Sequence, residues 1–130
     1  EGDIVERHLQ NGDLVLFGRQ PTLHKGSMIA RHVKIINENT NINNSQPIKT
    51  IRMNLAATKT YNADFDGDEM NIYVPQSYQT KCELEHLSST EALLKSGQSS
   101  RLLLCICQDA LLGGYLATRG EYRNINGKKT

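Results

Sequence analysis

Residues 61–71 read YNADFDGDEMN and place Asp64, Asp66 and Asp68 at alternate positions, with Gly67 between the last two. On a flat strand the three carboxylates would share one face but spread over about 13 Å, too far to bind one ion. Glycine adopts backbone conformations that other residues avoid, so Gly67 lets the chain curl here. A tight loop would then converge three carboxylates on one cation, and oxygen-only ligands suit Mg²⁺ or Mn²⁺.

The charge of this acidic loop, residues 64–68, favours a bound cation. Two carboxylates about 5 Å apart repel by about 3 kcal/mol at an effective dielectric constant of about 20, and three carboxylates make three such pairs. A cation would offset this repulsion. Because Mg²⁺ keeps several waters and takes other ligands from a substrate phosphate, such a site suits phosphoryl or nucleotidyl transfer.

Two other interpretations apply to the same residues. A calcium loop of the EF-hand type that begins at Asp64 would need glycine at its sixth position and glutamate at its twelfth, where the chain has Glu69 and Pro75. That type of calcium site is therefore excluded. An acidic surface turn without any ligand stays open as the alternative to a metal centre.

The charges of the chain are segregated along its sequence. Lys and Arg total 15 and Asp and Glu total 14, so the formal net charge is only +1. Yet the stretches 14–37 and 39–63 contain no acidic residue, and both contain basic ones. We therefore expect a basic surface that faces the acidic loop, an arrangement that can hold phosphates around a divalent metal.

Length and composition indicate one ordinary domain of 130 residues, and the chain reads as a piece of a longer protein because Glu1 opens it. Three cysteines without CxxC spacing argue against a disulfide framework and against a zinc site. The longest apolar run, residues 102–107, is far short of a membrane span. We therefore expect an intracellular protein without membrane contact.

The hydrophobic pattern predicts mainly β structure followed by helices. Apolar, β-branched or alternating segments predict strands over residues 14–17, 28–36, 51–55 and 70–74. An Asn-rich surface loop is expected at 37–47. Beyond residue 76 the pattern predicts a helix capped by Ser77, another capped by Ser89 or Thr90, a strand over 102–106 and a helix over 109–117.

Two segments resemble those of a known family. NADFDGDEMN, residues 62–71, resembles the metal-binding loop of the largest subunit of multisubunit DNA-directed RNA polymerases, and LFGRQPTLHKGSM, residues 16–28, resembles the segment that precedes it. VERH, VPQS and QDALLG extend the resemblance over most of the chain. Gly18 and Gly26 depart from the usual Asn and bulkier apolar residue, and the Asn-rich loop is long, so we expect a divergent or viral polymerase.

The resemblance implies a double-psi β-barrel over residues 1–76, one of two barrels in the polymerase active centre, followed by a helical extension over residues 77–130. It implies that the catalytic Mg²⁺, or Mn²⁺ as a substitute, is held by Asp64, Asp66 and Asp68. It implies contacts with the incoming NTP, at its ribose hydroxyls and in the surrounding pocket, from Arg19, Asn62, Gln20 and Pro21. It places three residues near the nucleic-acid backbone, namely His24, Lys25 and Arg31.

The resemblance further implies template-directed RNA synthesis, in which the RNA 3′ hydroxyl attacks the α-phosphate of an NTP and pyrophosphate leaves. The implied partners are the second-largest subunit, other polymerase subunits, the DNA template and the RNA transcript. The enzyme would lie in the nucleus of a eukaryotic cell, or in the cytoplasm or virion if viral, and this chain alone would be inactive. The alternatives are an RNA-templated polymerase of the silencing type, which has a related DxDGD loop, and a non-catalytic metal-binding or scaffold module.

Overall fold

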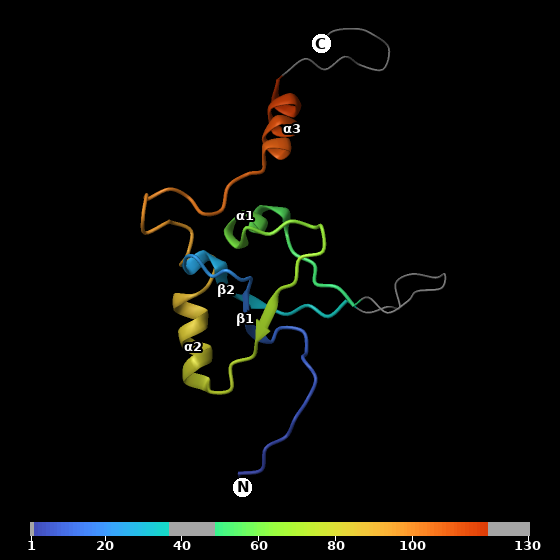
Figure 1. Cartoon of the computed structure of the whole chain (residues 1–130), viewed down its shortest axis with the longest axis vertical. Coiled ribbons are helices and arrows are strands. Elements are labelled where there is room, and N and C mark those ends of the chain that lie inside the picture. The colour runs from blue at the N-terminus through green and yellow to red at the C-terminus, as the bar shows by residue number, and fades with distance from the viewer. Residues whose placement is uncertain (1, 37–48, 120–130) are drawn as a thin grey trace, which may run out of the picture.

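The computed structural model describes residues 2–36 and 49–119, which form a mixed α/β structure (Figure 1). The strands within these ranges are β1 (Leu14–Gly18), β2 (Met28–His32) and β3 (Asn71–Tyr73). The α-helices are α1 (Thr58–Tyr61), α2 (Tyr78–Leu87) and α3 (Gln108–Thr118). Short 3₁₀ helices are η1 (Lys25–Ser27) and η3 (Leu55–Ala57).

The strands form an antiparallel sheet in the order β2-β1-β3. Gly18, the last residue of β1, lies opposite Met28 at the start of β2 and opposite Asn71 at the start of β3. The residue after β1 and the residues before β3 therefore lie at the same end of the sheet. This register brings Arg19 next to the acidic loop, although the two are far apart in the sequence.

Gly18 allows β1 and β2 to approach closely at this end of the sheet. A Cβ added to Gly18 would lie 2.9 Å from Cγ of Met28 and 3.1 Å from the carbonyl oxygen of Ser27. The carbonyl of Ser27 also accepts the N–H of Arg19 at 3.2 Å. A larger residue at position 18 would therefore displace the backbone that carries Arg19.

A small hydrophobic core attaches α1 to the sheet. Phe17 of β1, Ile29 of β2 and Tyr61 of α1 are buried and pack with two further buried residues, Ala57 and Leu93. The rings of Phe17 and Tyr61 meet edge to face, with centroids 5.3 Å apart and planes at 72°. Because Tyr61 comes shortly before the acidic loop, the core fixes the point from which the loop begins.

Several predicted elements are confirmed. The strands predicted at 14–17 and 70–74 correspond to β1 and β3, and the helix predicted over 109–117 corresponds to α3. Ser77 caps α2, because its Oγ accepts the N–H of Thr80 at 3.1 Å. The strand predicted over 28–36 is shorter and ends at His32.

Three local predictions are wrong. Residues 51–54 form no strand, because Asn54 caps η3 by accepting the N–H of Ala56 at 2.9 Å, and η3 leads directly into α1. The segment after Ser89 forms a turn rather than a helix. The strand predicted over 102–106 is reduced to an isolated bridge between Lys95 and Leu102.

Two other predictions are not tested by the described residues. The Asn-rich loop at 37–47 lies outside the described residues. The described strands make a three-stranded sheet, and the double-psi barrel and its boundary at residue 76 stay predictions. Among the described helices, none has both the length and the apolar character that crossing a membrane requires.

Candidate metal centre

Two residues, Asn62 and Ala63, connect the end of α1 to the acidic loop. Asn62, the residue after α1, adopts the left-handed conformation with φ 49° and ψ 43°, and its N–H donates to the carbonyls of Lys59 and Thr58. The N–H of Ala63 donates to the carbonyl of Thr58 at 2.9 Å. Asparagine is one of the few residues with a side chain that tolerates this conformation. The chain therefore turns sharply out of the helix into the acidic loop.

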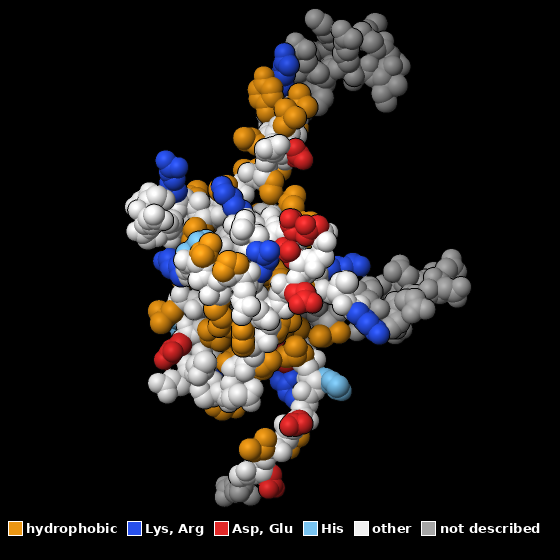
Figure 2. All heavy atoms as spheres, in the orientation of Figure 1, with side chains coloured by type: hydrophobic (Ala, Val, Ile, Leu, Met, Phe, Trp, Pro, Cys, Tyr) orange, Lys and Arg blue, Asp and Glu red, His pale blue; other side chains and the backbone are white. Residues whose placement is uncertain are grey.

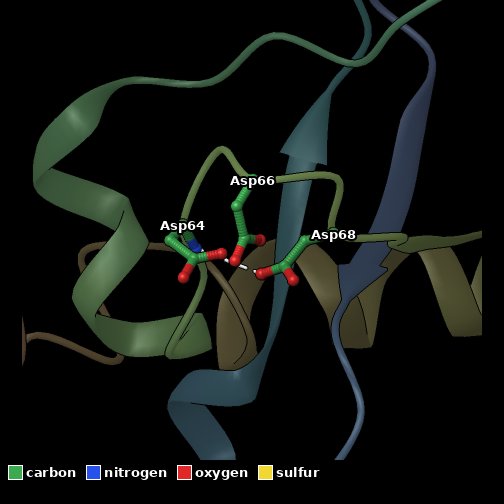
Figure 3. A group of neighbouring side chains, drawn as sticks. All are labelled: Asp64, Asp66 and Asp68. Atoms are coloured by element: carbon green, nitrogen blue, oxygen red, sulfur yellow. Dashed lines mark hydrogen bonds between the residues drawn. The ribbon is translucent and has the colours of Figure 1, made fainter.

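The acidic loop is closed by a hydrogen bond within it. The N–H of Asp64 donates to Oδ2 of Asp68 at 3.1 Å, and Gly67 has φ +117°, a conformation that side chains disfavour. One carboxylate oxygen from each of Asp64, Asp66 and Asp68 lies within 4.8 Å of the other two. The three side chains point toward one another from the loop (Figure 3). The structure thus brings the three predicted ligands together.

This group of oxygens suits a hard divalent cation. Mg²⁺ binds oxygens at about 2.1 Å, so neighbouring and opposite ligands lie about 3 to 4 Å apart. The separations within 4.8 Å in the loop come close to this range, and small side-chain rotations would close the difference. Asp64 and Asp66 are exposed, which leaves room for waters and a substrate phosphate. The residues present therefore fit Mg²⁺ or Mn²⁺.

The surroundings of Asp64 and Asp68 shift the pKa values of their carboxyl groups in opposite directions. A hydrogen bond with Asp66, together with the nearby carboxylates, raises the pKa of Asp64 above its usual value. The backbone N–H of Asp64, followed by the Arg19 guanidinium, lowers the pKa of Asp68. Asp68 is therefore the more readily ionised of these two.

Arg19 reaches the acidic loop from the end of β1. Its Nε lies 2.9 Å from Oδ2 of Asp68, and its Nη1 donates to the carbonyl of Tyr61 at 3.4 Å. The side chains of Arg19 and Asp68 are 20% and 19% exposed, so this ion pair is partly shielded from water. Figure 2 shows acidic and basic side chains next to one another on this face of the molecule.

The other residues predicted to surround the NTP are close in sequence to one or the other partner of this ion pair. Gln20 and Pro21 follow Arg19 directly and are exposed, with a cis peptide bond between them. Asn62 is exposed between α1 and the acidic loop. Arg19, Asn62 and the three aspartates therefore gather at one end of the sheet.

The three residues predicted near the nucleic-acid backbone differ in their exposure and in their internal hydrogen bonds. Nδ1 of His24 accepts the N–H of Gly26 at 3.1 Å and caps η1, while Lys25 is exposed. Arg31 donates from Nη1 to Thr90 Oγ1 at 2.6 Å and from Nε to the hydroxyl of Tyr61 at 3.4 Å. His24 and Lys25 are thus both exposed, whereas Arg31 is partly buried and engaged in internal contacts.

A cavity of about 430 Å³ lies against the sheet, separate from the acidic loop. It is lined by apolar side chains such as Val15 and Ile72 and by Arg31, but by none of the three aspartates. Nη2 of Arg31 is buried, and no hydrogen-bond partner for it lies among the described residues. The cavity therefore does not contribute to the candidate metal centre.

Sequence reasoning missed Tyr61 and the pairing of Arg19 with Asp68. Tyr61 is 1% exposed, and it contacts Arg19 through its carbonyl and Arg31 through its hydroxyl. Burial raises the pKa of this phenol, so it stays neutral as a partner. The signal in the sequence was an aromatic residue within the polar run TKTYNAD, directly before Asn62.

Comparison with known proteins places the chain in a family. The family model described as RNA polymerase Rpb1, domain 2, matches residues 1–90. A probable DNA-directed RNA polymerase II subunit RPB1 homolog of Invertebrate iridescent virus 6 is 50% identical over 135 aligned residues, which cover 96% of this chain and 12% of that protein.

Two cellular relatives agree with the viral one. The DNA-directed RNA polymerase II subunits RPB1-B and RPB1-A of Trypanosoma brucei brucei are 49% and 48% identical over 117 residues, or 90% of this chain and 6% of each relative. The chain thus spans a small part of the length of these proteins. Since the family model covers well over half of the chain, the chain belongs to the family of RNA polymerase Rpb1, domain 2.

Proposed function

We propose that the chain is the catalytic-centre module of a DNA-directed RNA polymerase, with Asp64, Asp66 and Asp68 as the ligands of its Mg²⁺. The observation that carries this proposal is the convergence of three carboxylate oxygens within 4.8 Å of one another, in a chain of the Rpb1 domain 2 family. The names of the relatives, which are DNA-directed polymerase subunits, favour a DNA template over the RNA template of the silencing enzymes.

The residues of the chain would prepare the site for nucleotidyl transfer. When bound, Mg²⁺ and a second metal that arrives with the NTP would together stabilise the charge on the attacking and leaving oxygens as a nucleotide joins the RNA 3′ end and pyrophosphate leaves. Asp64, Asp66 and Asp68 would hold the cation on a loop closed by the Asp64–Asp68 hydrogen bond. The exposure of Asp64 and Asp66 leaves an open side from which triphosphate and waters complete the shell.

Arg19 and Asn62 would read the sugar of the NTP. The guanidinium of Arg19 lies against Asp68, so its remaining N–H groups are close to the metal centre and can donate to ribose hydroxyls. Asn62 is exposed between α1 and the acidic loop, and its side-chain amide can both donate and accept hydrogen bonds. Gln20 and Pro21 would line the same pocket. His24 and Lys25, which are exposed, and the partly buried Arg31 would lie near the nucleic-acid backbone.

The sheet would be part of a larger active centre. We infer that β1, β2 and β3 belong to a double-psi β-barrel over residues 1–76, with residues 77–130 as its helical extension. The second-largest subunit would supply the facing barrel, and other subunits, the DNA template and the RNA transcript would complete the complex. The chain spans 12% of the viral relative, so activity would belong to the assembled enzyme. That enzyme would lie in the nucleus or, if viral, in the cytoplasm or virion.

Replacement of one ligand in the assembled polymerase tests this function. Asp66→Ala should reduce RNA extension on a primed DNA template by about a thousandfold, because a metal contributes several kcal/mol to stabilisation of the transition state. Glu83→Ala removes an exposed carboxylate from α2 as the matched control and should extend RNA normally. Normal extension by Asp66→Ala would refute the proposal, and extension on an RNA template alone would favour the silencing type.

A further inference from the structure

Asp68 is the one aspartate of the acidic loop with an ion-pair partner among the described residues. Nε of Arg19 donates to Oδ2 of Asp68 at 2.9 Å, and the same oxygen accepts the N–H of Asp64 at 3.1 Å. An sp² carboxylate oxygen offers two lone pairs. Both lone pairs of Oδ2 are therefore engaged by N–H donors.

Oδ2 is also the Asp68 oxygen that faces the other two carboxylates. In Figure 3 it lies at the end of the dashed bond to Asp64, on the side where Asp66 stands. A cation shared by the three aspartates would approach from this side. That cation would then compete with the two N–H donors, Nε of Arg19 among them, for the lone pairs of Oδ2.

We propose that Arg19 competes with the divalent cation for Asp68 and so lowers the affinity of the centre for the metal. This inference rests on the proposed metal-binding function. Metal binding and the ion pair between Arg19 and Asp68 oppose each other, so an incoming cation weakens the hold of Asp68 on the guanidinium. The N–H groups of Arg19 then become available to a substrate at the moment when the metal is in place.

Arg19 also has a second, smaller effect on the affinity of the centre for the metal, and this effect raises the affinity. A side chain that orients a metal ligand raises the affinity for the metal. Asp68, however, is also held by the N–H of Asp64 in its own loop, so part of this orientation survives without Arg19. The charge of Arg19 has no such substitute. A single and a double positive charge about 6 Å apart, even in a water-like dielectric, repel enough to change an equilibrium constant about tenfold.

The test is the binding of Mn²⁺ to the assembled, nucleotide-free polymerase, measured by electron paramagnetic resonance. The signal of the Asp66→Ala enzyme, which lacks a ligand, is subtracted to isolate this centre. Arg19→Gln should bind Mn²⁺ about tenfold more tightly than the wild type. Arg19→Lys keeps the charge and should bind within about threefold of the wild type. Arg52→Gln, which removes a guanidinium that makes no ion pair with a described acidic residue, should match the wild type.

The outcomes are distinct. Equal or weaker binding by Arg19→Gln would overturn the competition and leave the metal centre intact. Equal tightening in Arg19→Gln and Arg19→Lys would also overturn it, because charge would not be the cause. If wild type and Asp66→Ala gave the same signal, the proposed metal centre would fail and this inference with it. Should Arg19→Gln not assemble, Arg19→Met removes the same charge and has the same expected result.

Discussion

Asn62 and Gly67 set the path of the acidic loop, because both have positive φ, 49° and 117°. Asn tolerates the left-handed region, whereas a φ as large as that of Gly67 is nearly restricted to glycine. A Cβ added to Gly67 would have no atom within 4 Å, so the need for glycine is conformational and not steric. The convergence of the carboxylates thus depends on the positive φ at position 67, which only glycine adopts without strain.

Gly67→Ala should lower the free energy of unfolding of the chain by about 1 to 3 kcal/mol, the usual cost of such strained backbone. Urea unfolding followed by circular dichroism measures this change. Gly97→Ala is the matched control, since its added Cβ also meets nothing within 4 Å and its φ is not in the positive region. Equal stability of the two variants would show that the acidic loop does not need the conformation of Gly67.

Arg19→Ala and Asn62→Ala should each narrow the preference of the assembled polymerase for NTP over dNTP. A lost hydrogen bond to a ribose hydroxyl is worth about 1 kcal/mol, or about fivefold in discrimination. Single-nucleotide addition with matched NTP and dNTP measures the ratio, and Arg52→Ala serves as the control. Unchanged discrimination in both variants would remove Arg19 and Asn62 from the sugar-reading role.

The aspartate cluster could be predicted from the sequence because its causes are local. Asp64, Asp66 and Asp68 lie within five residues, and Gly67 stands where the chain must turn. The ion pair of Arg19 with Asp68 could not be predicted, since it depends on the antiparallel register of β1 and β3. The same distinction applies to Tyr61, whose burial depends on packing against Phe17.

Elements were predicted well where a local signal defined them. Ser77 marked the start of α2, and Pro75 marked the end of the strand that became β3. The alternation of Ile51, Met53 and Leu55 was misread as a strand, because a strand also needs a partner that local periodicity cannot reveal. In the structure Met53 packs against the core, while Ile51 and Leu55 are half exposed.

The segment before β1 is held to the sheet by Asp13. Its carboxylate accepts two hydrogen bonds from the guanidinium of Arg7, at 2.8 and 2.9 Å, and one from the N–H of Gln10 at 2.8 Å. The hydrogen bonds from Arg7, followed by the one from Gln10, hold the pKa of Asp13 well below its usual range. This cluster therefore stabilises the fold as long as Asp13 is ionised.

Asp13→Asn should lower the urea midpoint of the chain at pH 7, and the difference from the wild type should shrink with acid. Because the folded pKa is depressed, the stabilisation is present above the unfolded value of 3.8 and is lost as the pH falls through the folded value. Asp3→Asn, from the same segment, is the control and should have no such effect. A difference that is as large at pH 3 as at pH 7 would contradict this role of Asp13.

At the scale of the whole molecule, the near-neutral net charge of +1 is a sum over separated groups. Arg19 comes from an acid-free stretch, and its partner Asp68 comes from the acidic loop.

Part of the apolar surface of the described residues is exposed. Figure 2 shows hydrophobic side chains exposed along α3, where Leu111, Leu112 and Tyr115 are about 60% exposed. The described residues therefore bury only part of their apolar surface against one another.

The central claim is that the acidic loop holds one divalent cation in the assembled polymerase. It is tested most directly by replacing Mg²⁺ with Fe²⁺ and adding ascorbate and peroxide, because the radicals formed at bound iron cut the backbone nearby. We predict cuts within residues 64–68 and next to Arg19, present in the wild type and in Glu83→Ala and absent from Asp66→Ala. The same cuts in Asp66→Ala, or no cut near the acidic loop in the wild type, would contradict the claim.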